Sequence, residues 1–357
     1  MTETARRLRI AVLYGGRSSE HDVSVMSATN VMRALDPLQY DLVPVYVTRE
    51  GQWLLGSLAD GVPDTPSTGR ELCLVPGGEG RLLALADGKA EELPRVDALF
   101  PVLHGLNGED GSVQGLAQAA RVPLVGCGIL GSAAALDKDM TKRLLLQAGV
   151  PVARSITIRA GDAPAFGEIE AALGLPVFVK PARQGSSVGV SKVASEADWT
   201  AALELGFRHD PKLLVEEFVK GREIELAVLE APDGGLFVSR PGEIAPAESH
   251  GFYSYDAKYV DADGARVIVP AQLPQEVEER LKVLAAQAFA AVGCDAMARV
   301  DFFVTDSFDI RLNELNTIPG FTDISMYPKA MEASGIGYSQ LLDRLVEHGM
   351  ARAKRGQ

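Results

Sequence analysis

The sequence contains few cysteines, and their spacing argues against two common kinds of stabilised scaffold. Its three cysteines, Cys73, Cys127 and Cys294, lie far apart and form no C-x-x-C pair. This pattern supports neither a disulfide framework nor a cysteine-ligated zinc site. We therefore expect a protein of a reducing compartment, the cytoplasm.

Long apolar runs are absent as well. No segment approaches the roughly 18 consecutive apolar residues that a membrane-spanning helix needs. The apolar stretch from Ile10 to Tyr14 is too short for a secretion signal, and charged residues follow it at once. The sequence therefore predicts neither a membrane anchor nor export.

Positive charge is in the minority. The chain has 35 Lys and Arg residues against 48 Asp and Glu residues, which gives a formal net charge of -13. The resulting field opposes nonspecific attraction to DNA, RNA or an anionic membrane. We expect no nucleic-acid or membrane partner.

The length and composition are those of an ordinary globular protein with more than one domain. The 357 residues are 46% hydrophobic and 23% charged, which is close to average usage. At roughly 100 to 200 residues per domain, this length predicts two or three domains.

Strands and helices alternate in the first third of the chain, a pattern typical of a doubly wound parallel sheet. We predict strands over residues 8–14, 42–47, 98–103 and 122–125, and helices over 23–35 and 113–121. Residues 56–94 are rich in Gly and Pro and predict a loosely structured insertion or a hairpin. The first domain is expected to end at residue 126.

The remaining residues predict an α+β arrangement, which we divide into a central domain (127–220) and a C-terminal domain (221–357). The expected strands cover residues 155–158, 177–180, 190–193, 213–218, 223–229, 267–270, 298–304 and 310–316. Helices are expected over 132–148, up to about 173, over 275–292 and near the C-terminus. A glycine-rich loop before residue 190 predicts a hairpin rather than a crossover.

Two glycine motifs match known signatures but lack the surrounding structure that the chemistry needs. Gly126, Gly128 and Gly131 fit G-x-G-x-x-G, yet no acidic residue ends the next strand about 20 residues on, where a dinucleotide needs one. We interpret them as a tightly packed turn that joins two domains. Residues 185–189, GSSVG, fit G-x-S-x-G, but the chain continues as a strand, whereas a serine hydrolase needs a helix there.

A predicted hairpin near the C-terminus carries the strongest geometric signal. Arg299 and Asp301 lie two residues apart, so their side chains share one face of a strand, and Glu314 and Asn316 repeat this on the next strand. If the two strands pair antiparallel so that the numbers of opposite residues add to about 615, Asp301 lies opposite Glu314 and all four side chains project together. Two carboxylates and an amide oxygen suit Mg²⁺. The alternative is a solvated face with a salt bridge.

Two other segments gain meaning beside this hairpin. Lys180 ends a strand just before a loop that contains Ser186 and Ser187, and such a loop can cover phosphates with backbone N–H groups and one ammonium. Near the N-terminus, Glu20 lies at the carboxyl edge of the predicted parallel sheet, where an acid can hold a substrate ammonium. The alternative for Glu20 is compensation of the helix dipole.

The order of the motifs resembles that of the D-alanine–D-alanine ligases of the ATP-grasp superfamily. From residue 15 to about residue 325 the chain contains, in order, GGRSSEHDVS, HGLNGEDG, LDKDMTK, VKPARQGSSVGVSK, VEEFVKGREIE, YDAKY, ARVDFFV and NELNTIPGFT. Each motif is moderately specific, and together they are very specific. The resemblance implies an α/β and α+β fold of three domains, the ATP-grasp architecture, with an N-terminal doubly wound parallel sheet.

The resemblance also implies roles for the matching residues. The residues implied for ATP are Lys138, Lys180, Ser186, Ser187, Glu216, Glu217, Val219, Glu223, Lys258, Asn313 and Glu314. Those implied for the amino-acid substrates are Glu20, His104, Lys258, Arg299, Ser325 and Met326. Those implied for catalysis are Glu20, Ser186, Tyr259, Arg299 and Gly320. Asp301, Glu314 and Asn316 would hold two Mg²⁺ ions, for which Mn²⁺ can substitute.

The resemblance also implies a separate role for several of these residues. Glu20 would bind the ammonium of the first D-alanine, Arg299 and the Gly320 backbone would steady an oxyanion, and Ser325 would take the carboxylate of the second substrate. Tyr259 would close over the site from a long loop.

The implied reaction transfers the γ-phosphate of ATP to the first D-alanine and joins the resulting acyl phosphate to the amine of the second, for peptidoglycan synthesis. Residues 255–259, YDAKY, favour D-alanine as the second substrate, while D-lactate and D-serine stay open as alternatives. The resemblance further implies a homodimer formed through the N-terminal domain.

Overall fold

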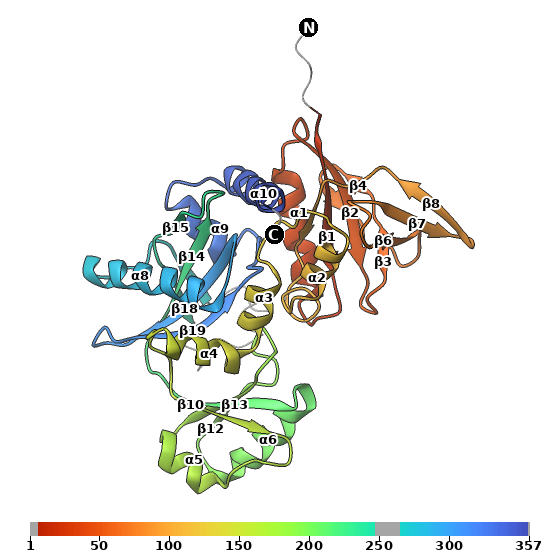
Figure 1. Ribbon diagram of the computed structural model, residues 1–357. Coiled ribbons are helices and arrows are strands. Elements are labelled where there is room, and N and C mark those ends of the chain that lie inside the picture. Colours follow the sequence, from red (N-terminus) through yellow and green to blue (C-terminus); the bar gives the residue numbers. More distant parts are fainter. Residues whose placement is uncertain (1–5, 247–264, 356–357) are drawn as a thin grey trace.

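The computed structural model describes residues 6–246 and 265–355. In these residues the strands form three main sheets, each built from its own part of the chain. Figure 1 shows the sheets in three bodies, with α3 and α4 close to the region where the bodies meet. The predicted Tyr259 and Lys258 lie outside the described residues.

The first sheet has the strand order β8-β7-β6-β3-β2-β1-β9. β1 pairs in parallel with β2 and with β9, which confirms the predicted parallel sheet. Ile10 to Leu13 are at most 1% exposed, as expected of an apolar strand covered on both faces. The elements are β1 (Leu8–Gly15), β2 (Tyr40–Val47), β3 (Trp53–Leu55), β6 (Glu71–Leu74), β7 (Leu82–Ala86), β8 (Lys89–Leu93), β9 (Ala98–Pro101), α1 (His21–Ala34) and α2 (Ser112–Ala119).

Of the two alternatives for residues 56–94, the hairpin is confirmed and the loosely structured insertion is wrong, and the strand predicted over 122–125 is also wrong. Residues 56–94 are an ordered antiparallel extension in which β6, β7 and β8 lengthen the sheet, and β4 (Leu58–Ala59) pairs with β5 (Val62–Pro63). Leu72, Leu74 and Leu82 face the core, but these strands are too short for their alternation to stand out among Gly and Pro. The predicted strand over 122–125 is reduced to a single bridge from Leu124.

The second sheet is antiparallel, with the order β10-β13-β11-β12. Its elements are β10 (Ser155–Arg159), β11 (Val177–Pro181), β12 (Ser191–Val193), β13 (Lys212–Glu217), α5 (Phe166–Leu173) and α6 (Glu196–His209). The predicted hairpin across the glycine-rich loop is confirmed, because Val179 pairs with Ser191. Helix α6 was not predicted from the sequence. It buries Trp199 and begins with a capping box at Ser195.

The third sheet has the order β17-β16-β14-β18-β19, and β15 pairs with β14. Its elements are β14 (Arg222–Glu230), β15 (Leu236–Val238), β16 (Gly242–Pro246), β17 (Ala265–Ile268), β18 (Met297–Val304), β19 (Ile310–Asn316), α8 (Gln275–Val292), α9 (Met326–Glu332) and α10 (Tyr338–Lys354). The predicted bounds of α8 match those observed. Figure 1 shows α10 between the first and third bodies, where Leu341 and Leu345 share one core with Ile10 and Leu229.

The helix predicted over residues 132–148 is in fact two helices. α3 (Ile129–Leu136) and α4 (Lys138–Gln147) are separated by Asp137, whose backbone is extended and whose side chain accepts a 3.2 Å hydrogen bond from the Met140 N–H. Asp is among the best N-cap residues, so the break is a new helix start. It makes Lys138 the first residue of α4.

The helices of the part of the chain that the structure describes were compared with the length and apolar character of a membrane span. No helix there is long and apolar enough to cross a bilayer.

Candidate active site

A cavity that is partly open to solvent, with about 680 Å³ of space not filled by protein atoms, lies where the three bodies meet. The first body contributes Glu20 and His104, the second contributes the glycine-rich loop, and the third contributes β18 and β19. The described residues that line it include Glu20, His104, Glu109, Lys138, Gly185, Ser186, Arg299, Glu314, Asn316 and Gly320. Eight of the predicted site residues are therefore gathered in the lining of one cavity.

The hairpin of β18 and β19 has the predicted register. Asp301 pairs with Glu314, and Arg299 pairs with Asn316. The pairing shifts by one residue between Asp301 and Phe302, where a bulge leaves Asn313 without a partner in the ladder. The Asn316 amide donates a 3.0 Å hydrogen bond to Asp301, so the side chains do project together.

Arg299 is the cationic centre of this face. Its guanidinium donates to both oxygens of Asp301, at 2.8 and 2.7 Å, and lies 3.0 Å from Glu225 on the neighbouring β14. Burial alone would lower the pKa of Arg299, but the Asp301 and Glu225 carboxylates hold it well above its usual range. The guanidinium therefore keeps a fixed positive charge inside the cavity.

Glu20 and the glycine-rich loop meet across the boundary between the first and second bodies. Ser186 donates a hydrogen bond to a Glu20 carboxylate oxygen. A Cβ at Gly185 would lie 2.8 Å from the other oxygen of Glu20, so a side chain here would displace the Glu20 carboxylate. Ser186 and Ser187 have φ angles of 49° and 59°, which non-glycine residues adopt only when the surroundings hold them.

A second buried charge cluster lies beside the cavity, on β11, β13 and α4. Glu216 pairs with Lys180 and with Lys142, whose Nζ is 2.6 Å from Oε1 of Glu216. Burial opposes ionisation of Glu216, but the two ammonium groups hold its pKa below the ordinary value. The sequence reading missed Lys142, although it closes the LDKDMTK motif.

The sequence reading also missed Glu109, which joins the first and third bodies. Its two oxygens accept hydrogen bonds from the backbone N–H of Gly105 at 2.8 Å and of Ile318 at 2.9 Å. Burial, together with the Glu20 charge, raises the pKa of Glu109 to about 7. The HGLNGEDG motif contains this residue, but its role depends on a contact 209 residues away.

His104 is buried beside Glu109 and holds the same segment. Its Nδ1 is 2.9 Å from the Ile318 carbonyl, and its Nε2 is 3.2 Å from the Ser27 hydroxyl. Burial lowers the pKa of His104, which favours a neutral ring. The ring therefore fixes the backbone leading to Gly320.

Other predicted residues lie near the cavity without being part of its described lining. Ser325 is the N-cap of α9. Its Oγ accepts a hydrogen bond from the Thr322 N–H, shares another with the Thr322 hydroxyl, and is 2.6 Å from where a Gly320 Cβ would be. Met326 is buried against Gly242 of β16.

The structure also describes three more of the residues predicted to bind ATP, Glu217, Val219 and Glu223. Glu217 accepts 2.8 and 2.6 Å hydrogen bonds from the Arg154 backbone and guanidinium. Val219 lies in the loop between β13 and β14, and Glu223 pairs with Phe303 within the third sheet. Their roles stay predictions.

The glycines of the G-x-G-x-x-G match are packed tightly, as interpreted from the sequence. A Cβ at Gly131 would lie 2.6 Å from the Cys127 sulfur and 2.7 Å from the Cys294 Cα. The Gly128 N–H donates a 2.5 Å hydrogen bond to Asp295. This turn therefore joins α3 to the end of α8.

Comparison with known proteins identifies this architecture. The solved D-alanine–D-alanine ligase of Coxiella burnetii is 34% identical, with a TM-score of 0.84 over 99% of this chain and 97% of that one. The solved VanG D-Ala:D-Ser ligase of Enterococcus faecalis is 36% identical, with a TM-score of 0.83 over 96% and 100% of the two chains. The fold is therefore that of the ATP-grasp ligases, as predicted.

Sequence comparison narrows the class to one family. Residues 9–127 match the family described as D-ala D-ala ligase N-terminus, and residues 144–347 match D-ala D-ala ligase C-terminus. The D-alanine–D-alanine ligase A of Brucella suis is 62% identical over 347 residues, which cover 97% of this chain and 98% of that protein. The chain belongs to the D-alanine–D-alanine ligase family.

Proposed function

We propose that the protein joins two D-alanine molecules at the expense of ATP and so supplies a peptidoglycan precursor. The observation that carries the proposal is the cavity in which Glu20, Lys138, Ser186, Arg299 and Glu314 converge from all three bodies. A carboxylate for an ammonium, cations for phosphate and carboxylate groups, and an acidic pair for metal ions are the groups that this reaction needs. The similarity to ligases of this name over nearly the whole chain supports it.

The chemistry needs charge placement more than covalent help from side chains. The γ-phosphate of ATP passes to the carboxylate of the first D-alanine, and ADP leaves. The amine of the second D-alanine, having lost a proton, then attacks the acyl phosphate, so that the peptide bond forms as phosphate leaves. Glu20 holds the ammonium of the first substrate, and the Ser186 hydroxyl holds the Glu20 carboxylate in place. Arg299, charged and anchored by Asp301, stabilises the oxyanion that forms.

The phosphates of ATP would be held by Lys138 and Lys180. The Lys138 ammonium is 2.7 Å from the Gln184 carbonyl and 3.5 Å from Glu314, so it lies between the glycine-rich loop and β19. Lys180 is anchored by Glu216. We assign Glu216, Glu217, Val219, Glu223 and Asn313 to the nucleoside side of this site.

The donor set around Glu314 fits Mg²⁺. Among residues 6–246 and 265–355 no group of three or more His, Cys, Asp or Glu side chains could hold a metal ion by itself. Mg²⁺, however, is usually bound through one or two carboxylates and completed by substrate phosphates and water. Asp301, Glu314 and Asn316 provide such a partial set, and Mg²⁺ or Mn²⁺ bound there would neutralise phosphate charge.

A second candidate function is ligation of D-alanine to D-serine or D-lactate. It is favoured by the 36% identity to a D-Ala:D-Ser ligase. The assay that separates the candidates is phosphate release from purified protein with ATP, Mg²⁺ and D-alanine, with D-serine or D-lactate added as the second substrate. We expect release with D-alanine alone and none with L-alanine. An equal response to L-alanine would refute the stereochemical assignment, and release only with D-serine would favour the second candidate.

The proposal also covers the division into domains, the location of the protein and its oligomeric state. We assign residues 1–126, 127–220 and 221–357 to three domains, because each range contains one main sheet, although α4 of the central range packs with the third sheet. The family resemblance favours a cytoplasmic homodimer formed through the N-terminal domain. Light scattering on the purified protein would test the dimer, for which a monomer mass at micromolar concentration would be the contrary result.

A further inference from the structure

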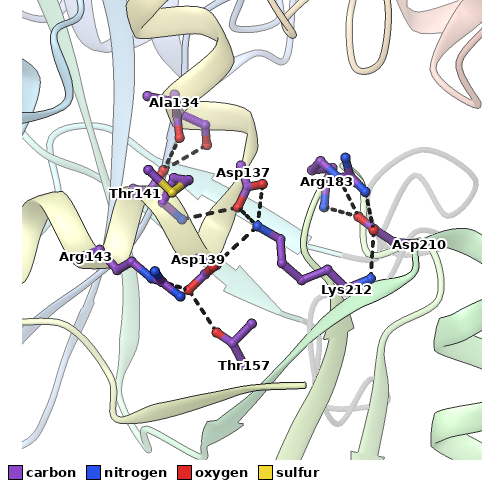
Figure 2. A network of polar contacts seen from close by, with 11 residues as sticks. Ala134, Asp137, Asp139, Thr141, Arg143, Thr157, Arg183, Asp210 and Lys212 are labelled. Carbon is purple, nitrogen blue, oxygen red and sulfur yellow. Dashed lines mark hydrogen bonds and ion pairs between the residues drawn. The ribbon is translucent and has the colours of Figure 1, made fainter. Parts of the chain in front are cut away.

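The inference concerns Lys212, a buried lysine that is no part of the cavity's described lining. It is the first residue of β13 and is 7% exposed. Its ammonium is 2.6 Å from both oxygens of Asp137 and 3.3 Å from Asp139. Figure 2 shows the side chain extending from its strand to the start of α4, where these two carboxylates lie. Lys212 and Asp139 are buried and the Asp137 side chain is 15% exposed. Burying charged groups is costly, so this cluster calls for an explanation.

The two carboxylates flank Lys138, the proposed phosphate ligand. Asp137 caps α4 and Asp139 belongs to its first turn. The residues directly before and after Lys138 in the chain therefore both contact the Lys212 ammonium. Asp139 also accepts a 2.9 Å hydrogen bond from Thr157 of β10, a second contact from the central sheet. The first turn of α4 is therefore held on both sides of Lys138.

The backbone completes the connection between Lys212 and Lys138. The Lys138 N–H donates to the Ala182 carbonyl at 3.0 Å, and the Ala182 N–H donates to the Lys212 carbonyl at 3.0 Å. Ala182 directly follows β11, at the start of the glycine-rich loop. The side-chain and backbone contacts thus form a closed ring that ties α4 to the central sheet.

The ring spans two bodies of the molecule. Leu145 of α4 belongs to the same apolar core as Leu281 and Phe289 of α8, so α4 packs with the third sheet. Lys212 and Thr157 belong to the central sheet. The proposed nucleotide site lies between these two sheets. The ring therefore fixes the position of one sheet relative to the other at the point where Lys138 reaches into the site.

We propose that Lys212 is a positioning residue for nucleotide binding, which acts by holding Asp137 and Asp139 so that Lys138 points at the phosphates. The proposal rests on the proposed function, because it takes Lys138 as a phosphate ligand. Lys212 itself does not contact phosphate, since its ammonium is taken up by the two carboxylates.

The test is a calorimetric titration with AMP-PNP and Mg²⁺, which needs no turnover. We expect Lys212→Met to weaken nucleotide binding about tenfold, which corresponds to about 1.4 kcal/mol. The KM for D-alanine should change less than about twofold, because Glu20 is not part of the ring. An equal loss for both substrates would point to general damage and overturn the proposal.

A double substitution separates positioning from simple structural support. In a Lys138→Ala background, Lys212→Met should add less than about twofold to the loss of AMP-PNP affinity, because the two residues then act as one unit. A full additional tenfold loss would show that Lys212 acts by another route and would overturn the proposal.

Two further variants guard against a folding defect. Asp137→Asn keeps a good N-cap but removes the charge that pairs with Lys212, and it should weaken AMP-PNP binding in the same direction. The control is Lys282→Met on α8, whose ammonium pairs with Glu278 and Glu279 at 3.0 and 3.1 Å, and which should leave binding unchanged. Wild-type binding of AMP-PNP without phosphate release from D-alanine would refute the proposed function alone.

Discussion

Glu314 lies opposite Asp301 in the hairpin and 3.5 Å from the Lys138 ammonium. We expect Glu314→Gln to lower kcat about 100-fold, because the amide keeps the shape but loses the negative charge that binds Mg²⁺ and orients phosphate. The measurement is phosphate release as a function of Mg²⁺ concentration. Glu243→Gln, which breaks an ion pair with Arg222 on β14, is the matched control and should change kcat less than twofold. Normal turnover in the Glu314 variant would exclude the metal site.

The raised pKa of Glu109 should affect stability at mildly acidic pH. In the folded protein this carboxyl titrates at about 7, whereas its ordinary value is 4.5. Between these values the unfolded chain is ionised while the folded protein keeps the proton, so the stabilising contribution present below pH 4.5 is lost as the pH rises to 7. A rise of this size corresponds to about 3 kcal/mol.

The check is the thermal-unfolding midpoint of wild type and Glu109→Gln at pH 5 and pH 7.5. The variant carries no proton-binding group at this position, so its midpoint should change less between the two pH values than that of wild type. Identical changes would show that Glu109 titrates normally.

At the scale of single residues, the sequence predicted the groups but not all of their partners. Spacing placed Arg299 and Asp301 on one face, because strand periodicity is a local property. Glu109 and Lys212 were missed because their partners lie on other elements, brought close only by the packing of helices and sheets. Residue type alone does not distinguish such a buried charge from a solvated one.

Two helix glycines offer a matched test at the scale of the element. A Cβ at Gly131 of α3 would meet the Cys127 sulfur and the Cys294 backbone, whereas one at Gly115 of α2 would meet nothing within 4 Å. We expect Gly131→Ala to destabilise the protein by about 1–3 kcal/mol through overpacking. Gly115→Ala should be neutral or stabilise it by up to about 1 kcal/mol.

The measurement is again the unfolding midpoint, followed with and without NAD⁺. A stable Gly131→Ala variant would contradict the packing assigned to this turn. A shift of the wild-type midpoint by NAD⁺ would revive the dinucleotide reading of the motif.

Elements with long, regular patterns were predicted well, and interrupted ones were not. The 18 residues of α8 repeat apolar positions without a break, so both ends could be located. The break between α3 and α4 was missed because helix-forming residues lie on both sides of Asp137, and only the cap shows that a new helix begins. For residues 56–94 the sequence left a loose insertion and a hairpin open, because the sheet neighbours of this segment, not its own composition, make it ordered.

The arrangement of cores predicts how the whole molecule unfolds. Leu345 of α10 is fully buried in a core that also contains β1 and β14, so the first and third bodies share it. Ile169 of α5 is fully buried in a core confined to the central body. Substitution of either residue by Ala should cost about 2–5 kcal/mol, but in different parts of the molecule.

Differential scanning calorimetry should therefore show that Leu345→Ala and Ile169→Ala lower different transitions. The Leu345 variant should affect the transition shared by the first and third bodies, and the Ile169 variant that of the central body. One transition lowered equally by both would mean that all three bodies unfold together.

The sheet extension formed by residues 56–94 has a practical consequence for single-molecule and surface-based experiments. All of these residues are described, and none lines the cavity. The extension ends in β8, whose charged, exposed side chains discourage edge-to-edge association. The turn at Asp87 and Gly88, between β7 and β8, is thus a natural position for a dye or a tether, which would immobilise the enzyme with its cavity free.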